Sequence, residues 1–285
     1  MPGTHNIPRV LSIAGSDSGG GAGIQADLKA FAACGVHGMT AITAITAQNT
    51  VGVTAVHAVP PGIIIAQVRA VAADIGIDAV KIGMLGDRPT IEAVAQALDE
   101  LPEGTPVVLD PVMVSESGAQ LLDPTAKATL TDVLLPRATV ITPNLPEARA
   151  LLAQDGAPDD VEELARALHA LGPEVVVITG GHRDEATDLF FDGRRLVELP
   201  GARHPDGAAH GSGCTHSSVL AARLARGDDP LVAARTAKKL ASRAVANGLE
   251  EIGAGAGPVD VLELAANPPK AIHNDARRGR RTMGF

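Results

Sequence analysis

The 285-residue sequence contains no tryptophan, no tyrosine and only four phenylalanines. Aromatic side chains are the platforms on which proteins stack nucleobases, and a basic surface is the usual footprint of nucleic-acid binding. The formal net charge here is -9 at pH 7. We therefore expect no nucleic-acid partner, and a hydrophobic core built from aliphatic side chains.

Cysteine is also scarce, because the sequence holds only Cys34 and Cys214. Two cysteines without CxxC spacing form no disulfide framework, which favours a reducing compartment. The first residues, MPGTHNIPRV, lack the apolar core of a secretion signal. No run of ~18 or more apolar residues predicts a membrane-spanning helix. We expect a cytoplasmic protein with no membrane partner.

The residues that are present suit a folded domain. Hydrophobic residues make up 45% of the chain and charged residues 20%, as in ordinary globular proteins. Without a linker-like segment or an internal repeat, residues 1–266 are predicted to form a single domain. Residues 267–285 are predicted to be a disordered basic tail, since two prolines are followed by four arginines.

Short aliphatic runs alternate with helical patterns along the chain. The predicted strands are residues 10–14, 38–47, 79–82, 106–109, 139–141 and 175–178, with a hairpin of residues 187–191 and 196–199. The predicted helices are residues 23–34, 60–75, 89–101, 124–134, 144–153, 161–171, 213–226 and 230–249. This alternation indicates an α/β fold with a central mostly parallel sheet, helices on both faces and a late antiparallel edge hairpin.

Ligands of open α/β sheets bind at the carboxyl ends of the strands, where the first candidate is AGSDSGGGAG, residues 14–23 (the glycine loop). Its GAG, with an alanine three residues on, fits the dinucleotide pattern GxGxxA only loosely, because residues 41–47 hold no acidic residue for a ribose. A Walker A loop is excluded, since GK[ST] does not occur. A tight strand–helix turn needs fewer glycines, so we predict that a ligand approaches this backbone closely.

Three polar side chains follow other predicted strands. Gln48 offers a donor and an acceptor suited to the edge of a nitrogen heterocycle, although a polar turn is the simpler interpretation of an isolated glutamine. Asp110 and Glu147 lie at neighbouring strand ends and could hold Mg²⁺ directly or through water. A helix-capping or ion-paired role is an equal alternative for either carboxylate alone.

The motif HGSGCT, residues 210–215 (the anion loop), precedes an alanine-rich helix. Small residues bring backbone N–H groups toward one point, and the helix N-terminus adds partial positive charge, which predicts an anion hole for phosphoryl transfer. Cys214 would lie in the first helical turn, where thiol pKa values are lowered, and is predicted to take a proton from a substrate hydroxyl. A buried structural cysteine is the alternative, and it is our interpretation of Cys34. The predicted catalytic set is Gly211, Ser212, Gly213 and Cys214.

Other catalytic signatures are missing from the sequence. Neither HExxH nor GxSxG occurs, and the nine histidines show no zinc spacing. Each histidine is therefore interpreted as a surface or capping residue rather than a ligand-binding one.

Seven motifs occur in order: AGSDSGGGAGIQADLKAF, ITAQNT, KIGML, VVLDPVM, ITPNLPEA, TGGH and HGSGCT. Each is weak alone, but over residues 10–260 they together resemble the hydroxymethylpyrimidine / phosphomethylpyrimidine kinase family of thiamine biosynthesis. The resemblance implies a ribokinase-like fold, a homodimer, and ATP and Mg²⁺ as co-substrates. It implies phosphorylation of 4-amino-5-hydroxymethyl-2-methylpyrimidine and then of its monophosphate, giving the pyrophosphate.

The resemblance also implies roles for the residues that match its motifs. The substrate-binding set is Gly15, Ala22, Asp27, Gln48, Met84 and Val112, with Asp27 and Gln48 on the aminopyrimidine. The nucleotide-binding set is Asn144, Thr179, Gly181 and Lys238, and the metal set is Asp110 and Glu147. Related sugar kinases and many pyridoxal kinases carry Asp where this chain has Cys214, which favours a pyrimidine substrate.

Three segments depart from the family pattern. Thr179 stands where the family often has the lysine of Lys-Gly-Gly-His, so a charge contact to the phosphates is in doubt, and Lys238 is a cation that could replace it. Ala208 and Ala209 replace a polar pair before the anion loop, and GAGP at residues 255–258 replaces GHGP.

Two alternatives therefore stay open, a pyridoxal kinase and a non-catalytic pyrimidine-binding sensor. Residues 203–209 contain Pro and Gly and are predicted to be a flap that closes the site.

Overall fold

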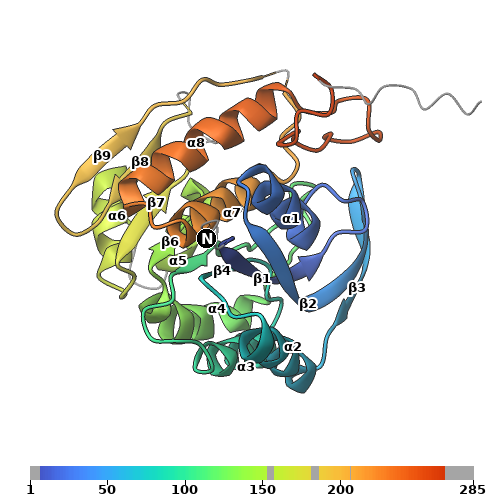
Figure 1. Ribbon diagram of the computed structural model, residues 1–285. Coiled ribbons are helices and arrows are strands. Elements are labelled where there is room, and N and C mark those ends of the chain that lie inside the picture. The colour runs from blue at the N-terminus through green and yellow to red at the C-terminus, as the bar shows by residue number, and fades with distance from the viewer. Residues whose placement is uncertain (1–6, 153–156, 181–185, 206, 267–285) are drawn as a thin grey trace, which may run out of the picture.

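The computed structural model describes residues 7–152, 157–180, 186–205 and 207–266, and a nine-stranded sheet runs through them (Figure 1). Its strands are β1 (Arg9–Ser16), β2 (His37–Asn49), β3 (Gly52–Ala58), β4 (Ala79–Ile82), β5 (Val107–Leu109), β6 (Val140–Ile141), β7 (Val175–Ile178), β8 (Asp188–Phe191) and β9 (Leu196–Leu199). Their order is β3-β2-β1-β4-β5-β6-β7-β8-β9. The strands from β2 to β7 in this order are parallel, whereas β3 at one edge and the β8–β9 hairpin at the other are antiparallel.

Helices cover both faces of this sheet (Figure 1). One face packs against α1 (Gly23–Ala33), α7 (Ser212–Ala225) and α8 (Pro230–Ala246), and the other against α2 (Pro61–Asp74), α3 (Arg88–Leu98), α5 (Leu145–Leu152) and α6 (Val161–His169). Between β5 and β6 the chain forms 3₁₀ turns at Pro124–Ala126 and Leu135–Arg137, with α4 (Lys127–Thr129) and a π-helical turn (Leu130–Leu134) between them.

The aliphatic strands contribute side chains to two hydrophobic clusters, one on each face of the sheet. Along β7, Val176 and Ile178 join the cluster beneath α2, α3 and α6, whereas Val175 and Val177 join the cluster beneath α7 and α8. Successive side chains of a strand point to opposite faces, so a strand covered on both sides needs an unbroken aliphatic run such as VVVI. The predicted fold class is confirmed.

The largest difference from the predicted elements lies at one edge of the sheet. The predicted strand at 38–47 is longer, because β2 runs to Asn49, and the antiparallel β3 that follows it was not predicted. Most side chains of β3 are exposed, so its sequence lacks the alternation that a half-buried strand shows.

The helix predicted at 124–134 is also wrong in detail. Asp123 does cap it, since its Oδ1 accepts a hydrogen bond from the Thr125 backbone N–H at 2.8 Å, but the turns that follow change from 3₁₀ to α to π geometry. The predicted tail at 267–285 lies outside the described residues, and the single domain stays a prediction.

In the part of the chain that the structure describes, no helix combines the length and hydrophobicity needed to cross a membrane.

Candidate active site

A cavity of about 470 Å³ opens at the carboxyl ends of the parallel strands, a volume suited to a small ligand. The glycine loop after β1, the end of β2 and the loops after β4, β5, β6 and β7 form its wall, together with the anion loop and α8. Of the predicted site residues, the wall contains Gly15, Ala22, Gln48, Met84, Asp110, Val112, Asn144, Glu147, Thr179, Gly211, Ser212, Gly213, Cys214 and Lys238. Gly181 lies outside the described residues. Arg203, His204, Pro205, Gly207 and Ala209 of the predicted flap also line the cavity, and its closure stays a prediction.

The glycine loop is folded around the carboxylate of Asp17. Its Oδ1 accepts from the Gly19 N–H at 2.8 Å, and its Oδ2 accepts from the N–H groups of Gly21 and Ala22 at 3.0 and 2.8 Å. His210 Nε2 lies 3.0 Å from the same Oδ2, at the start of the anion loop. Burial raises the pKa of Asp17, but the hydrogen bonds from His210 and the backbone outweigh it and the pKa is lowered. The sequence analysis missed both residues, although each lies within a quoted motif.

The glycine loop and the anion loop are in direct contact. Gly211 has φ +83°, and a Cβ atom there would lie only 1.8 Å from the carbonyl oxygen of Gly21. The helix α7 begins one residue later, and its first turn is part of the cavity wall. The N–H groups of a first turn have no partner within the helix. The Ser212 N–H already donates to the Ala209 carbonyl at 3.0 Å, which leaves those of Gly213 and Cys214 as the better candidates for an anion.

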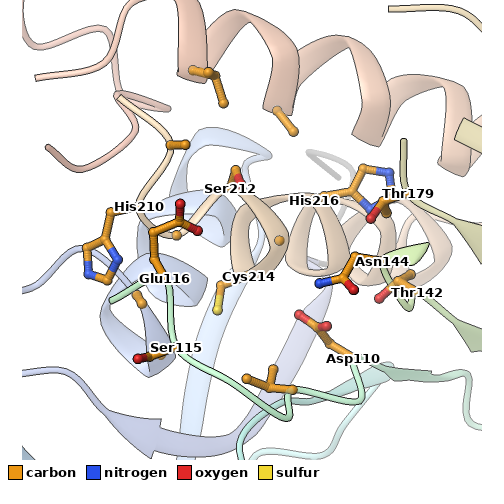
Figure 2. Close-up of a pocket in the computed structure, with 18 of the residues that line it drawn as sticks. Asp110, Ser115, Glu116, Thr142, Asn144, Thr179, His210, Ser212, Cys214 and His216 are labelled. Carbon is orange, nitrogen blue, oxygen red and sulfur yellow. The ribbon is translucent and has the colours of Figure 1, made fainter. Parts of the chain in front are cut away.

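The expected acidic thiol at Cys214 is contradicted. Burial raises the pKa of Cys214 to about 12, and the charges of Asp27 and Asp110 add to this, while the Lys81 ammonium opposes it. Figure 2 shows Cys214 and Asp110 directed into the same space from α7 and from the end of β5. In the ligand-free protein the thiol is therefore protonated at neutral pH, and its role as a base stays a prediction.

Asp27 corrects a second prediction. Its side chain is fully buried and is not part of the cavity wall. Its Oδ1 accepts from Ser218 Oγ at 2.7 Å and its Oδ2 from Ser12 Oγ at 2.6 Å, while Lys81 Nζ lies 2.9 and 3.1 Å from the two oxygens. Both oxygens are thus engaged in a cross-link of β1, α1, β4 and α7, behind the cavity wall rather than on it.

Asp110 and Glu147 meet at the ends of β5 and β6. Asp110 Oδ2 accepts from Ser217 Oγ at 3.0 Å. Glu147 and Asn144 cap α5 reciprocally, each side chain accepting from the other's backbone N–H at 2.9 Å. Burial and the charge of Asp110 raise the pKa of Glu147 to about 8, and burial also raises the pKa of Asp110. The capping role is therefore present, and the two carboxyl groups repel each other.

These residues fit Mg²⁺, because a cation between two crowded carboxylates relieves their repulsion. Mg²⁺ prefers oxygen ligands and is commonly held by one or two carboxylates together with substrate phosphates. Among the described residues no group of three or more His, Cys, Asp and Glu side chains could hold a metal by itself. The donor set thus suits an ion shared with a nucleotide.

The other end of the cavity is formed by Thr179, Asp188 and Lys238. Thr179 follows β7 and pairs with Asn144 in a parallel bridge. Lys238 Nζ lies 2.6 Å from Asp188 Oδ1, which also accepts from the Gly180 N–H at 2.8 Å. Burial raises the pKa of Asp188, but His216 and Lys238 outweigh it and the pKa is lowered. Sequence reasoning missed Asp188 because it looked for signals in loops, and Asp188 is the first residue of a buried strand.

A family model described as phosphomethylpyrimidine kinase matches residues 17–260. The hydroxymethylpyrimidine/phosphomethylpyrimidine kinase of Rhizobium meliloti is 52% identical over 256 residues, which cover 87% of this chain and 95% of the relative. The structure of the pyridoxal kinase from Staphylococcus aureus in complex with ADP aligns with a TM-score of 0.81 at 34% identity, covering 93% of this chain and 96% of that one. The phosphomethylpyrimidine kinase from Clostridium difficile aligns with a TM-score of 0.71 at 42% identity, covering 81% and 96%.

Proposed function

This chain belongs to the phosphomethylpyrimidine kinase family, and we propose that it phosphorylates 4-amino-5-hydroxymethyl-2-methylpyrimidine and then its monophosphate with ATP. The observation that carries the proposal is the contact between the glycine loop and the anion loop at one cavity, with Asp110 and Glu147 beside them. A ring bound against the first loop places its substituent next to the N-terminus of α7. Phosphoryl transfer depends mostly on such positioning and on charge stabilisation.

The pyrimidine lies against Met84 and Val112, with the Gln48 amide on its polar edge. Glycine at position 15 leaves room for Met84: a Cβ there would lie 2.7 Å from Met84 Cε, so the end of the Met84 side chain would have to move. The hydroxymethyl oxygen faces Cys214, whose protonated thiol orients it. Because the transition state of phosphoryl transfer is largely dissociative, the hydroxyl proton is lost late and passes to an oxygen of the transferred phosphoryl group, so an acidic cysteine is not required.

The phosphates of ATP lie between the N-terminus of α7 and the cavity end formed by Asn144, Thr179 and Lys238. Bound Mg²⁺ supplies positive charge to these phosphates, and Asp110 and Glu147 are the residues that would hold it. In the second step the acceptor is the monophosphate, which already carries negative charge and needs no deprotonation of a hydroxyl group.

We also propose that two copies associate through the hairpin of β2 and β3. Ile45, Val51 and Val56 are 53%, 60% and 54% exposed on this edge of the sheet, where a neighbouring strand could also pair with β3. The reducing cytoplasm is the proposed compartment, since both cysteines are free.

The test is ADP release with Mg²⁺-ATP and one of four acceptors: hydroxymethylpyrimidine, its monophosphate, pyridoxal or ribose. Turnover with both pyrimidines is expected and would show that Thr179 is tolerated. Turnover with pyridoxal alone would make the chain a vitamin B6 kinase. Pyrimidine binding without turnover would support the sensor alternative.

A further inference from the structure

His216 is the one histidine of α7, and it is buried against the cavity. Its side chain is 5% exposed and contributes to the cavity wall. Its Nε2 faces Asp188, whereas its Nδ1 has no partner among the described residues. Buried polar groups in native proteins almost always have a partner. A buried Nδ1 without one, in a side chain at the wall of an active-site cavity, indicates that a ligand supplies it.

The surroundings of His216 define the charge of that ligand. His216 Nε2 lies 3.3 Å from Asp188 Oδ2, while Lys238 Nζ lies 2.6 Å from Asp188 Oδ1. Asp188 is buried between them, so one carboxylate holds a histidine from α7 and a lysine from α8. Two nitrogen donors anchored in this way at one end of a cavity suit an anion. Figure 2 shows His216 on the same side of the view as Thr179 and Asn144, with His210 and Ser115 opposite.

We propose that His216 is a phosphate-binding residue of this kinase, which donates to the β-phosphate of the bound nucleotide beside Lys238, and that Asp188 positions both donors. This inference rests on the proposed function. Thr179 at the same end carries no charge, so His216 and Lys238 are the donors that Asp188 brings to the nucleotide. The interpretation of every histidine as a surface or capping residue is wrong for His210 and His216, which are both buried.

The test compares ADP with AMP, because they differ only in the β-phosphate. His216→Leu is expected to weaken ADP binding about tenfold and to leave AMP binding within about twofold, since a charge-assisted hydrogen bond is lost and tenfold corresponds to ~1.4 kcal/mol. His216→Gln, which retains an N–H donor, is expected to lose less. His169→Leu on α6, whose ring packs on Phe191, is the matched control and should change neither affinity. Isothermal titration calorimetry measures all of these without any turnover.

A rescue experiment separates phosphate binding from a structural role. Thr179→Lys in the His216→Leu background adds a cation at the same cavity end and is expected to restore at least about half of the lost binding free energy, a recovery of roughly threefold. Equal losses for ADP and AMP, or unchanged ADP binding by both His216 variants, would overturn the inference and leave the kinase function standing. No ADP binding by the unmodified protein would refute both.

Discussion

At the scale of single residues, Cys214 shows how burial competes with a helix N-terminus. A thiol in the first turn gains from the partial positive charge of the helix, yet here burial and two nearby carboxylates raise its pKa to about 12. An anionic ligand cannot lower that value, but Mg²⁺ beside Asp110 would. For the protonated thiol, the role that we propose is contact with the acceptor oxygen of the bound substrate.

Cys214→Ala is expected to slow the first phosphorylation about tenfold more than the second, because only the first acceptor is a hydroxyl group that needs orienting. Separate assays with hydroxymethylpyrimidine and its monophosphate measure the two rates. Cys214→Ser should retain most of the first rate, since a hydroxyl can replace the thiol contact. Equal losses in both steps would rule out a specific role for this side chain.

The raised pKa of Glu147 predicts how the stability of the protein depends on pH. Its pKa rises from an ordinary value of 4.5 to about 8 in the folded protein, so between these values the folded state binds more protons than the unfolded state. Stability must then fall as pH rises from about 5 to 8. In a chelating buffer, the midpoint of thermal unfolding should fall across this range, and Glu147→Gln should flatten the fall.

Calorimetry is the suitable method, because a protein without tryptophan or tyrosine lacks the usual fluorescence signal. A slope that is identical in the wild type and in Glu147→Gln would mean that Glu147 titrates normally. Addition of Mg²⁺ with ADP should raise the midpoint most at the alkaline end, where the two carboxylates are both charged.

At the scale of elements, the site depends on two loops that come from opposite ends of the chain. Asp17 and His210 are 193 positions apart and join the loops through one hydrogen bond, and the backbone of Gly211 lies against that of Gly21. The Lys81–Asp27 pair fixes the elements behind them, since it connects β4 to α1. The loops are thereby held at a spacing that admits no side chain between them.

Gly211→Ala is therefore expected to lower kcat about 100-fold, because the clash with Gly21 would displace the N–H groups of Gly213 and Cys214, and losing one backbone anion donor has an effect of this size. Two costs combine here, the left-handed backbone and the clash with Gly21. Gly227→Ala is the matched control: Gly227 has φ +87°, but no atom lies within 4 Å of its added Cβ. Both variants should lose about 1–2 kcal/mol of stability from the backbone. A comparable loss of kcat in Gly227→Ala would show that the contact between the loops is unimportant.

At the scale of the whole molecule, the two edges of the sheet differ. The β8–β9 hairpin lies beside α8 and the nucleotide end of the cavity, whereas β2 and β3 form an exposed ribbon at the other edge (Figure 1). Ribbons with exposed apolar side chains are places where proteins associate. The proposed homodimer therefore uses an edge of the sheet that the single chain leaves uncovered.

Val56→Lys is expected to weaken self-association at least about tenfold, because a charge would be buried in the contact. Val232 on α8 is 47% exposed, so Val232→Lys is the matched control and should leave association unchanged. Sedimentation equilibrium measures both. Dissociation caused equally by both substitutions would place the contact elsewhere. A monomeric unmodified protein would refute the proposed dimer.

The sequence by itself determined the α/β fold class, nearly all of the strands and helices, and the loops that line the cavity. These follow from local physics: aliphatic runs such as VVVI, turn residues and the helix cap at Asp123 act over a few positions. The motifs marked the glycine loop and the anion loop for the same reason, since their glycines are needed within the loops themselves. The strand β3 was not predicted, because a ribbon that buries few side chains shows no alternation of apolar and polar residues.

Only the tertiary structure decided what several of these side chains do. Asp27 is held by Lys81, and the partly buried Cys214 lies among charges from three other elements, so neither role could be inferred from neighbours in sequence. Asp188, His216 and Lys238 come from β8, α7 and α8 and form one cluster. Desolvation and Coulomb interactions depend on distance in space, and that distance is fixed only when the sheet brings its strand ends and helices to one cavity.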